Sequence, residues 1–232
     1  MFKKIFALLV MTVFLCGCIK VETDLTINNN GSAVVKERFM MSKQLLAMAG
    51  QDPFEQAIKE KQTNDREIVP YETDEMKGFE AKLVIKNLDT DKWNITQESN
   101  AIKTNNLDKK FVSVKKDFFR TIYNIDAEFD ITKSSENSSD TTAQLDAMKA
   151  SGMDMSNFLQ YKYTIRIPKK ADLHNANHVD VNNNAYIWDI KFGEINKVQM
   201  KFTIYNVTNI LIVWYLSFVS CLKLYLEIEI DV

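Results

Sequence analysis

The sequence predicts an α+β fold: a mostly antiparallel sheet of about seven to nine strands with two or three helices on one face. Most of the chain between residues 19 and 205 alternates apolar and polar residues, the period of strands with one buried face. Helical spacing is confined to residues 42–63 and 143–151. A long uncharged stretch after residue 206 adds a C-terminal membrane helix to this prediction.

Composition limits the classes of function. The chain has 232 residues, of which 46% are hydrophobic and 26% charged, and its formal net charge is -2. These values exclude collagen-like, low-complexity and fully disordered proteins. The near-neutral charge and the scarcity of arginine among the basic residues give no electrostatic reason to expect a nucleic-acid partner.

The first eighteen residues have the pattern of an export signal. Lys3 and Lys4 precede an apolar run over residues 5–14, which is too short to span a membrane. The following Leu15-Cys16-Gly17-Cys18 looks like the lipobox of bacterial lipoproteins. We therefore predict a signal peptide over 1–17, cleavage after Gly17, and diacylglyceryl and palmitate-type acyl chains on Cys18. The alternative is an uncleaved N-terminal anchor.

The exported part opens with a predicted hairpin and two helices. Strands over 19–27 and 32–41 flank Asn28-Asn29-Asn30-Gly31, residues that tolerate the positive φ angles of tight turns. Ser42 is the predicted N-cap of a short helix. Asp52, followed by Pro53, is the predicted start of a second helix.

The remaining strands follow from the same alternation. Tyr123, Ile125, Ala127 and Phe129 are the predicted buried side of the longest run, and Trp188 is predicted to pack in the core. The predicted strands cover 68–71, 79–85, 111–114, 119–131 and 158–167, with a closing hairpin of 185–192 and 197–205 around Gly193.

One segment gives a hint of ligand binding. The Ser/Thr-rich stretch 132–142 predicts a mobile loop, and a short helix is predicted over 143–151. Methionines repack readily, so these side chains and a neighbouring phenylalanine could form a lid over an apolar ligand; ordinary helix packing is the alternative. The residues concerned are Met148, Met153, Met155 and Phe158.

The C-terminal segment 206–232 allows two interpretations. A transmembrane helix over about 207–226 fits the uncharged stretch. Residues 222–232 alternate apolar and polar side chains, which favours a buried strand instead.

Motifs of known enzymes are absent from the sequence, which contains no Gly-x-Ser-x-Gly elbow, phosphate-binding glycine loop or Cys-x-x-Cys. His174 and His178 could hold a metal only if they shared a helix, and their Asn-rich surroundings favour solvated loop histidines, so we predict no metal and no cofactor. Asp126, Glu128 and Asp130 share one strand face, where a solvated surface is the simpler interpretation than an acidic site.

Three features in order resemble a known family. They are the lipobox cysteine leading into residues 21–32, the turn at Ile167-Pro168, and the Ala185–Gly193 stretch containing Trp188. This order resembles the LppM-like family of bacterial envelope lipoproteins. The resemblance covers residues 18–222 and implies an extracytoplasmic α+β domain without an assigned enzyme activity. It also implies a lipid- or envelope-binding role.

These predictions combine into a domain plan: signal peptide 1–17, extracytoplasmic domain 18–205 and hydrophobic segment 206–232. The predicted function is that of a cell-membrane lipoprotein whose non-enzymatic domain binds an envelope lipid, glycan or protein. Its predicted membrane partners are the lipids that surround the anchor. The alternatives are an envelope hydrolase with an unrecognised acidic site and a structural component of a membrane assembly.

Overall fold

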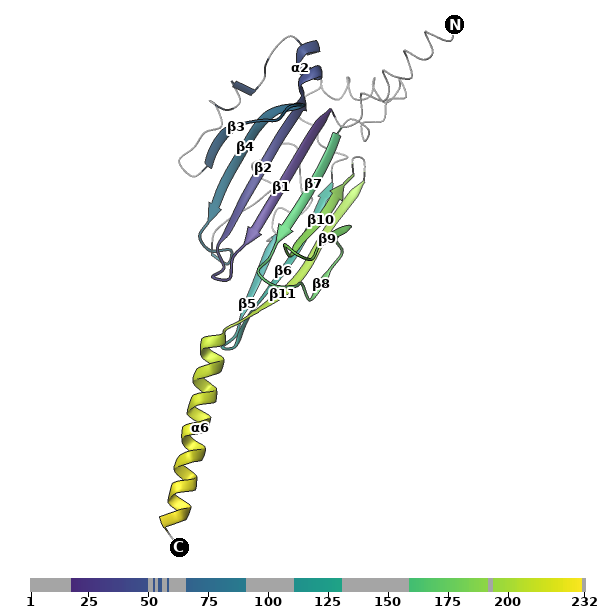
Figure 1. Cartoon of the computed structure of the whole chain (residues 1–232). Helices are drawn as coiled ribbons and strands as arrows, with labels where there is room; N and C mark the ends of the chain where they lie inside the picture. The colour runs from purple at the N-terminus through teal and green to yellow at the C-terminus, as the bar shows by residue number, and fades with distance from the viewer. Residues whose placement is uncertain are drawn as a thin grey trace.

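The structure is a computed structural model of the chain. It describes residues 18–49, 52, 54–55, 58, 66–90, 111–130, 159–191 and 194–230, with backbone only at 48, 49, 66, 130 and 224–230. Two sheets and two helices of defined length make up this part of the chain (Figure 1).

The larger sheet has seven strands in the order β3-β4-β2-β1-β7-β10-β9. β1 and β7 run parallel, and every other neighbouring pair is antiparallel. The strands are β1 (Ile19–Ile27), β2 (Ala33–Ser42), β3 (Arg66–Glu72), β4 (Met76–Ile85), β7 (Leu159–Arg166), β9 (His178–Asp180) and β10 (Ala185–Ile190).

The smaller sheet has four antiparallel strands in the order β5-β6-β11-β8. The long central pair, β6 and β11, is in register from Ile195 opposite Asp130 to Tyr205 opposite Arg120. The strands are β5 (Val112–Lys116), β6 (Arg120–Asp130), β8 (Leu173–His174) and β11 (Ile195–Tyr205).

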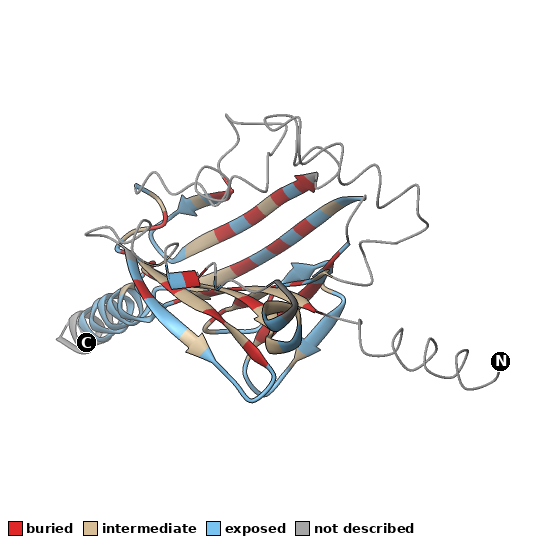
Figure 2. Cartoon of the chain, turned by 90° about the horizontal axis from the view of Figure 1, so that it is seen from above, coloured by how far each residue is buried: buried red, intermediate tan, exposed pale blue. Residues whose placement is uncertain are grey.

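The hydrophobic core lies between the two sheets. Buried and exposed residues alternate along the strands, so each strand contributes one face to the core (Figure 2). Tyr163 of β7 lies at its centre, 6.2 Å from the ring of Phe111 and 5.6 Å from the ring of Phe129. Tyr123 and Phe202 stack at 4.8 Å between neighbouring strands of the smaller sheet.

The opening hairpin and its first helix confirm the predictions. Gly31 has a φ of 82°, which a residue without a Cβ adopts freely in the β1–β2 turn. α2 (Lys43–Ala49) begins after Ser42, whose Oγ accepts a hydrogen bond of 3.2 Å from the Leu45 amide.

The expectation of a single sheet is wrong. The strands divide into two sheets, and the second sheet packs on the inner face of the first. α2 lies at one end of the larger sheet, and α6 (Val207–Ile230) extends from the opposite end of the molecule (Figure 1).

The predicted closing hairpin is also wrong. β10 pairs with β7 and β9, whereas β11 pairs with β6 and β8 in the other sheet. The chain crosses between the sheets after Lys191, whose amide donates to the Asn196 side chain (2.8 Å) and whose carbonyl accepts from it (2.8 Å). These bonds replace ladder bonds at the crossing.

The predicted C-terminal helix is present, but its membrane-spanning role is not supported. Within the described residues, no helix combines the length and the apolar character needed to cross a bilayer. Asn206, Thr208 and Asn209 precede the apolar run and Lys223 follows it.

Several predictions concern residues outside this description. They are the loop over 132–142, the helix over 143–151, and the ligand candidates Met148, Met153, Met155 and Phe158. The signal peptide over 1–17 also lies outside it.

Candidate functional site

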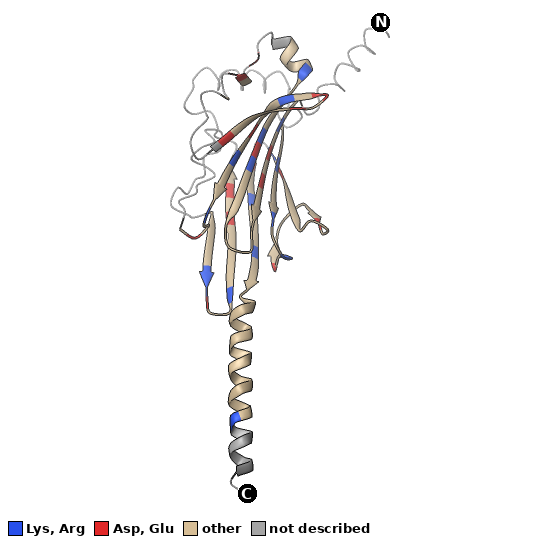
Figure 3. Cartoon of the chain, turned by 60° about the vertical axis from the view of Figure 1, so that its left-hand side comes forward, with Lys and Arg blue, Asp and Glu red and all other residues tan. Residues whose placement is uncertain are grey.

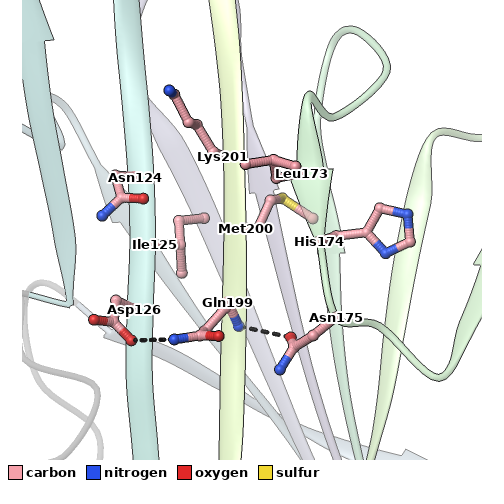
Figure 4. A pocket seen from close by; sticks show the side chains of 9 residues that line it. All are labelled: Asn124, Ile125, Asp126, Leu173, His174, Asn175, Gln199, Met200 and Lys201. Atoms are coloured by element: carbon pink, nitrogen blue, oxygen red, sulfur yellow. Dashed lines mark hydrogen bonds between the residues drawn. The ribbon is translucent and has the colours of Figure 1, made fainter.

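A shallow, open groove of about 350 Å³ lies on the outer side of the smaller sheet. It is formed where β8 runs alongside the β6–β11 pair (Figure 4). Its lining residues are Asn124, Ile125, Asp126, Leu173, His174, Asn175, Gln199, Met200 and Lys201.

Strand alternation explains why polar side chains surround this groove. Ile125 and Met200 point into the core and are 1% and 2% exposed. Their neighbours therefore point outward: Asn124 lies opposite Lys201, and Asp126 lies opposite Gln199. Asp126 Oδ1 accepts a hydrogen bond of 3.3 Å from Gln199 Nε2.

Asn175 holds the β8 wall in place. Its Oδ1 accepts from the Trp188 indole (2.8 Å) and from the Gln199 amide (2.8 Å). Its Nδ2 donates to the Lys197 carbonyl (2.9 Å). One side chain thus connects β10 of the larger sheet with β11 of the smaller sheet, so the groove wall is fixed to both.

Three polar groups of the groove have no protein partner among the described residues. The Lys201 ammonium makes no ion pair there, and the Asn124 amide and His174 Nε2 make no hydrogen bond. His174 Nδ1 accepts from the Ala176 amide at 3.3 Å, so a neutral His174 presents its Nε2–H as a donor. The groove therefore offers donors and acceptors to a ligand.

Two other outward residues of β11 have polar partners. Lys197 Nζ lies 3.9 Å from Glu128, and Thr203 Oγ1 donates to Asp172 at 2.7 Å. Ser113 and Lys115 of β5, on the same outer face but outside the groove, have no polar side-chain partner among the described residues.

The acidic strand face has one member in the groove. Asp126 lines it, Glu128 pairs with Lys197 outside it, and only the backbone of Asp130 is described. Glycosidases of both stereochemical classes use two carboxyl groups across the scissile bond, whereas this groove contains one.

The two histidines do not share a helix. His174 is in β8 of the smaller sheet and its ring lies 4.8 Å from the ring of Tyr186. His178 is in β9 of the larger sheet, with Nε2 3.1 Å from Asp189 Oδ2. The helical arrangement that would direct both rings to one metal ion is not formed.

Cys18 lies directly before β1. Its carbonyl accepts from the Ser42 amide at 2.7 Å, so it belongs to the edge of the β1–β2 ladder. Its side chain is 7% exposed in the full chain. The predicted lipid-attachment residue thus sits at the end of the larger sheet that carries α2 (Figure 1).

A second polar cluster is enclosed in the core. Thr23 Oγ1 and the Tyr161 hydroxyl lie 3.3 Å apart, and Tyr163 follows on the same face of β7. The Tyr163 hydroxyl is buried without a hydrogen-bond partner among the described residues. Burial raises the pKa of both tyrosines well above the usual value of 10.0.

Sequence reasoning singled out Asp126 and His174 but missed Asn124, Asn175, Gln199 and Lys201. Their outward positions follow from strand alternation. Their meeting depends on pairing between strands about 75 residues apart, as in Asn124 opposite Lys201. A single sequence carries no direct signal of such pairing.

No family model and no curated protein sequence matches the chain. Among solved structures, it is similar to the NMR structure of the folded domain of the LppM protein from Mycobacterium tuberculosis. The two are 10% identical, with a TM-score of 0.42 over 84% of this chain and 95% of that chain. This is a weak similarity at the level of the fold.

Proposed function

We propose that this chain is a bacterial envelope lipoprotein, held on the outer face of the cell membrane by lipid on Cys18. Its folded domain acts by binding an envelope component and carries out no reaction of its own. The groove on the smaller sheet is the binding surface.

The position of Cys18 is the observation that supports this proposal most. β1 begins at Ile19, immediately after the lipobox-like Leu15-Cys16-Gly17-Cys18. Cleavage after Gly17 would therefore release a chain whose first residue is already attached to the sheet through Ser42. The lipid and the domain would be joined without a linker.

The burial of Cys18 has a mechanistic consequence. Acyl transfer requires the Cys18 thiol at the membrane surface, whereas its side chain is 7% exposed in the chain that still carries residues 1–17. We infer that lipid attachment precedes the packing of this end of the sheet.

The binding role rests on the groove. Its three unpartnered polar groups suit recognition, and its single carboxylate does not supply the pair that glycoside hydrolysis needs. The proposed ligand is an envelope lipid, glycan or protein.

Metabolic labelling tests the anchor. Bacterial cells that express the full chain are grown with labelled palmitate, and the purified protein is analysed for label. Cys18→Ala should abolish labelling. Cys221→Ser is the matched control, because Cys221 is exposed on α6 and should leave labelling unchanged. Unlabelled wild-type protein would overturn the proposal.

A further inference from the structure

We infer that Asn30 is a site of spontaneous deamidation and that the folded β1–β2 turn protects it from that reaction. Among the six glycines of the chain, Gly31 is the one that follows an asparagine. A glycine has no Cβ to crowd the reacting atoms, so its backbone nitrogen can attack the side chain of the preceding asparagine. The reaction needs only water, and it is therefore independent of lipid on Cys18 and of a ligand in the groove.

The reaction joins two neighbouring groups of the turn. The Gly31 backbone nitrogen bonds to Asn30 Cγ and loses its proton to solvent, while Oδ1 carries the negative charge that develops. The Cγ–Nδ2 bond then breaks, and Nδ2 takes up a proton and leaves as ammonia. Water opens the resulting succinimide at either of its carbonyls, which leaves aspartate or isoaspartate in place of Asn30.

The backbone of the folded turn keeps the two reacting atoms apart. The Gly31 amide donates to the Asn28 carbonyl at 3.1 Å, and Gly31 has a φ of 82°. This is the pattern of a three-residue hairpin loop built on a type I turn, in which the residue before the glycine has a ψ of about 0°. Ring closure requires the Gly31 nitrogen to eclipse the Cβ of Asn30, a rotation of about 120° from that ψ. The rotation breaks the bond to Asn28.

The side chain of Asn30 is held by Ser32. Its Oδ1 accepts from the Ser32 amide at 3.0 Å and from the Ser32 hydroxyl at 2.7 Å. The same hydroxyl accepts from Asn28 Nδ2 at 2.9 Å, so it connects the two asparagine side chains. The carboxamide of Asn30 is therefore fixed although the residue is exposed. Opening the turn breaks these bonds, and each of them adds to the free energy of opening.

The turn is also joined to the rest of the fold. The Leu88 amide donates to the Gly31 carbonyl at 3.0 Å. A Cβ at Gly31 would lie 3.0 Å from the hydroxyl of Tyr123, which belongs to the smaller sheet. Isoaspartate lengthens the backbone by one carbon atom before Gly31, so the modified hairpin cannot close again in the same register.

Deamidation would place a charge in an uncharged turn. Basic and acidic residues are interspersed along the strands of both sheets (Figure 3), whereas residues 28–32 include none. The new carboxylate replaces a neutral amide, so ion-exchange chromatography separates the modified protein from the unmodified protein.

The test incubates the full-length, detergent-solubilised protein in mildly alkaline buffer, with and without guanidinium chloride. Peptide mapping by mass spectrometry follows the conversion of Asn30. We expect conversion at least about tenfold faster in guanidinium chloride, because the folded protein reacts only through the molecules whose turn is open. Asn184 is the internal control: it has a positive φ of 46°, but Ala185 follows it, so it should convert far more slowly than Asn30 in guanidinium chloride.

Two serine variants test the hold of Ser32 in the folded protein. Ser32→Ala removes the hydroxyl bond to Asn30 Oδ1 and should raise the rate of conversion about fivefold, the factor that corresponds to one hydrogen bond. Ser42→Ala is the matched control, because it removes the bond to the Leu45 amide at the other end of β2 and should leave the rate unchanged.

Two results would overturn the inference. One is conversion of Asn30 that is as fast in the folded wild-type protein as in guanidinium chloride, or that is absent from both; this comparison needs no variant. The other is an equal rate of conversion in Ser32→Ala and Ser42→Ala proteins whose circular dichroism shows that both are folded.

Discussion

Glu37, Thr23 and Tyr163 lie side by side on the inner faces of β2, β1 and β7. This polar row crosses the core beside a smaller aromatic cluster, in which the rings of Phe39, Phe54 and Phe79 are 6.0–6.2 Å apart. Such a row costs free energy wherever a hydroxyl lacks a partner.

The two buried tyrosines predict opposite effects of the same substitution. Tyr163→Phe removes a buried hydroxyl without a partner among the described residues and should raise the free energy of unfolding by about 1 kcal/mol. Tyr161→Phe removes the bond to Thr23 and should lower it by about 1 kcal/mol. Urea denaturation of both variants measures the difference. A larger loss for Tyr163→Phe than for Tyr161→Phe would contradict this assignment.

The raised pKa values of Tyr161 and Tyr163 predict a loss of stability at alkaline pH. Burial is the main cause, and it keeps both hydroxyls protonated in the folded chain. The unfolded chain releases these protons near pH 10, so above that pH the folded state binds more protons than the unfolded state. The contribution of these tyrosines to the free energy of unfolding is therefore fully present below pH 10. Above pH 10 the free energy of unfolding should fall by about 1.4 kcal/mol per pH unit for each tyrosine.

Urea midpoints measured at pH 9, 10 and 11 check this dependence. The double variant Tyr161→Phe, Tyr163→Phe should lose stability less steeply above pH 10, because two of the groups that titrate on unfolding are gone. An equally steep loss of stability in the double variant would show that other titratable groups cause the pH dependence.

A glycine-to-alanine change inside a strand ordinarily stabilises the fold, but we expect Gly78→Ala to destabilise it. Gly78 lies opposite Met40 in the β2–β4 ladder, and an added Cβ would overlap the Phe39 carbonyl oxygen. Because that atom is backbone, the strands must separate, and Gly78→Ala should destabilise by about 3 kcal/mol. Val84→Ala, at an exposed position on the same face of β4, is the control. A stabilised Gly78→Ala protein in urea denaturation would refute this account.

At the scale of elements, Asn175 joins the two sheets through three side-chain hydrogen bonds. Asn175→Ala leaves the Trp188 indole and the Gln199 amide without their acceptor, so we expect a loss of about 3 kcal/mol in calorimetric unfolding. Asn183→Ala is the control, because the Asn183 side chain bonds to Asp180 within the same turn. Equal losses in both variants would show that Asn175 does not connect the sheets.

The elements also show what a single sequence can specify. Alternation located β1, β2, β6 and β7 to within one or two residues, and the Asn-Gly turn fixed the first hairpin, because both signals are local. Alternation does not determine which strand a given strand pairs with in the sheet. β10 and β11 are neighbours in the chain yet join different sheets, and the deciding contacts, such as Trp188 with Asn175, arise only on folding.

At the scale of the whole molecule, two features lie at opposite ends. Cys18 lies directly before β1, at the end of the sheet that carries α2. α6 extends from the far end of the molecule (Figure 1), with exposed apolar side chains such as Leu211, Trp214 and Phe218. If Cys18 holds the membrane, β1 carries the chain away from it, and both the groove and α6 lie on the distal side. The proposed lipid on Cys18 would therefore set which end of the domain faces the membrane.

The intact mass of the protein extracted from bacterial membranes tests this claim most directly. The account predicts a mature chain that begins at Cys18 and carries the added mass of a diacylglyceryl group and an amide-linked acyl chain. A chain that retains residues 1–17, or one that begins at Cys18 without added lipid mass, would contradict it.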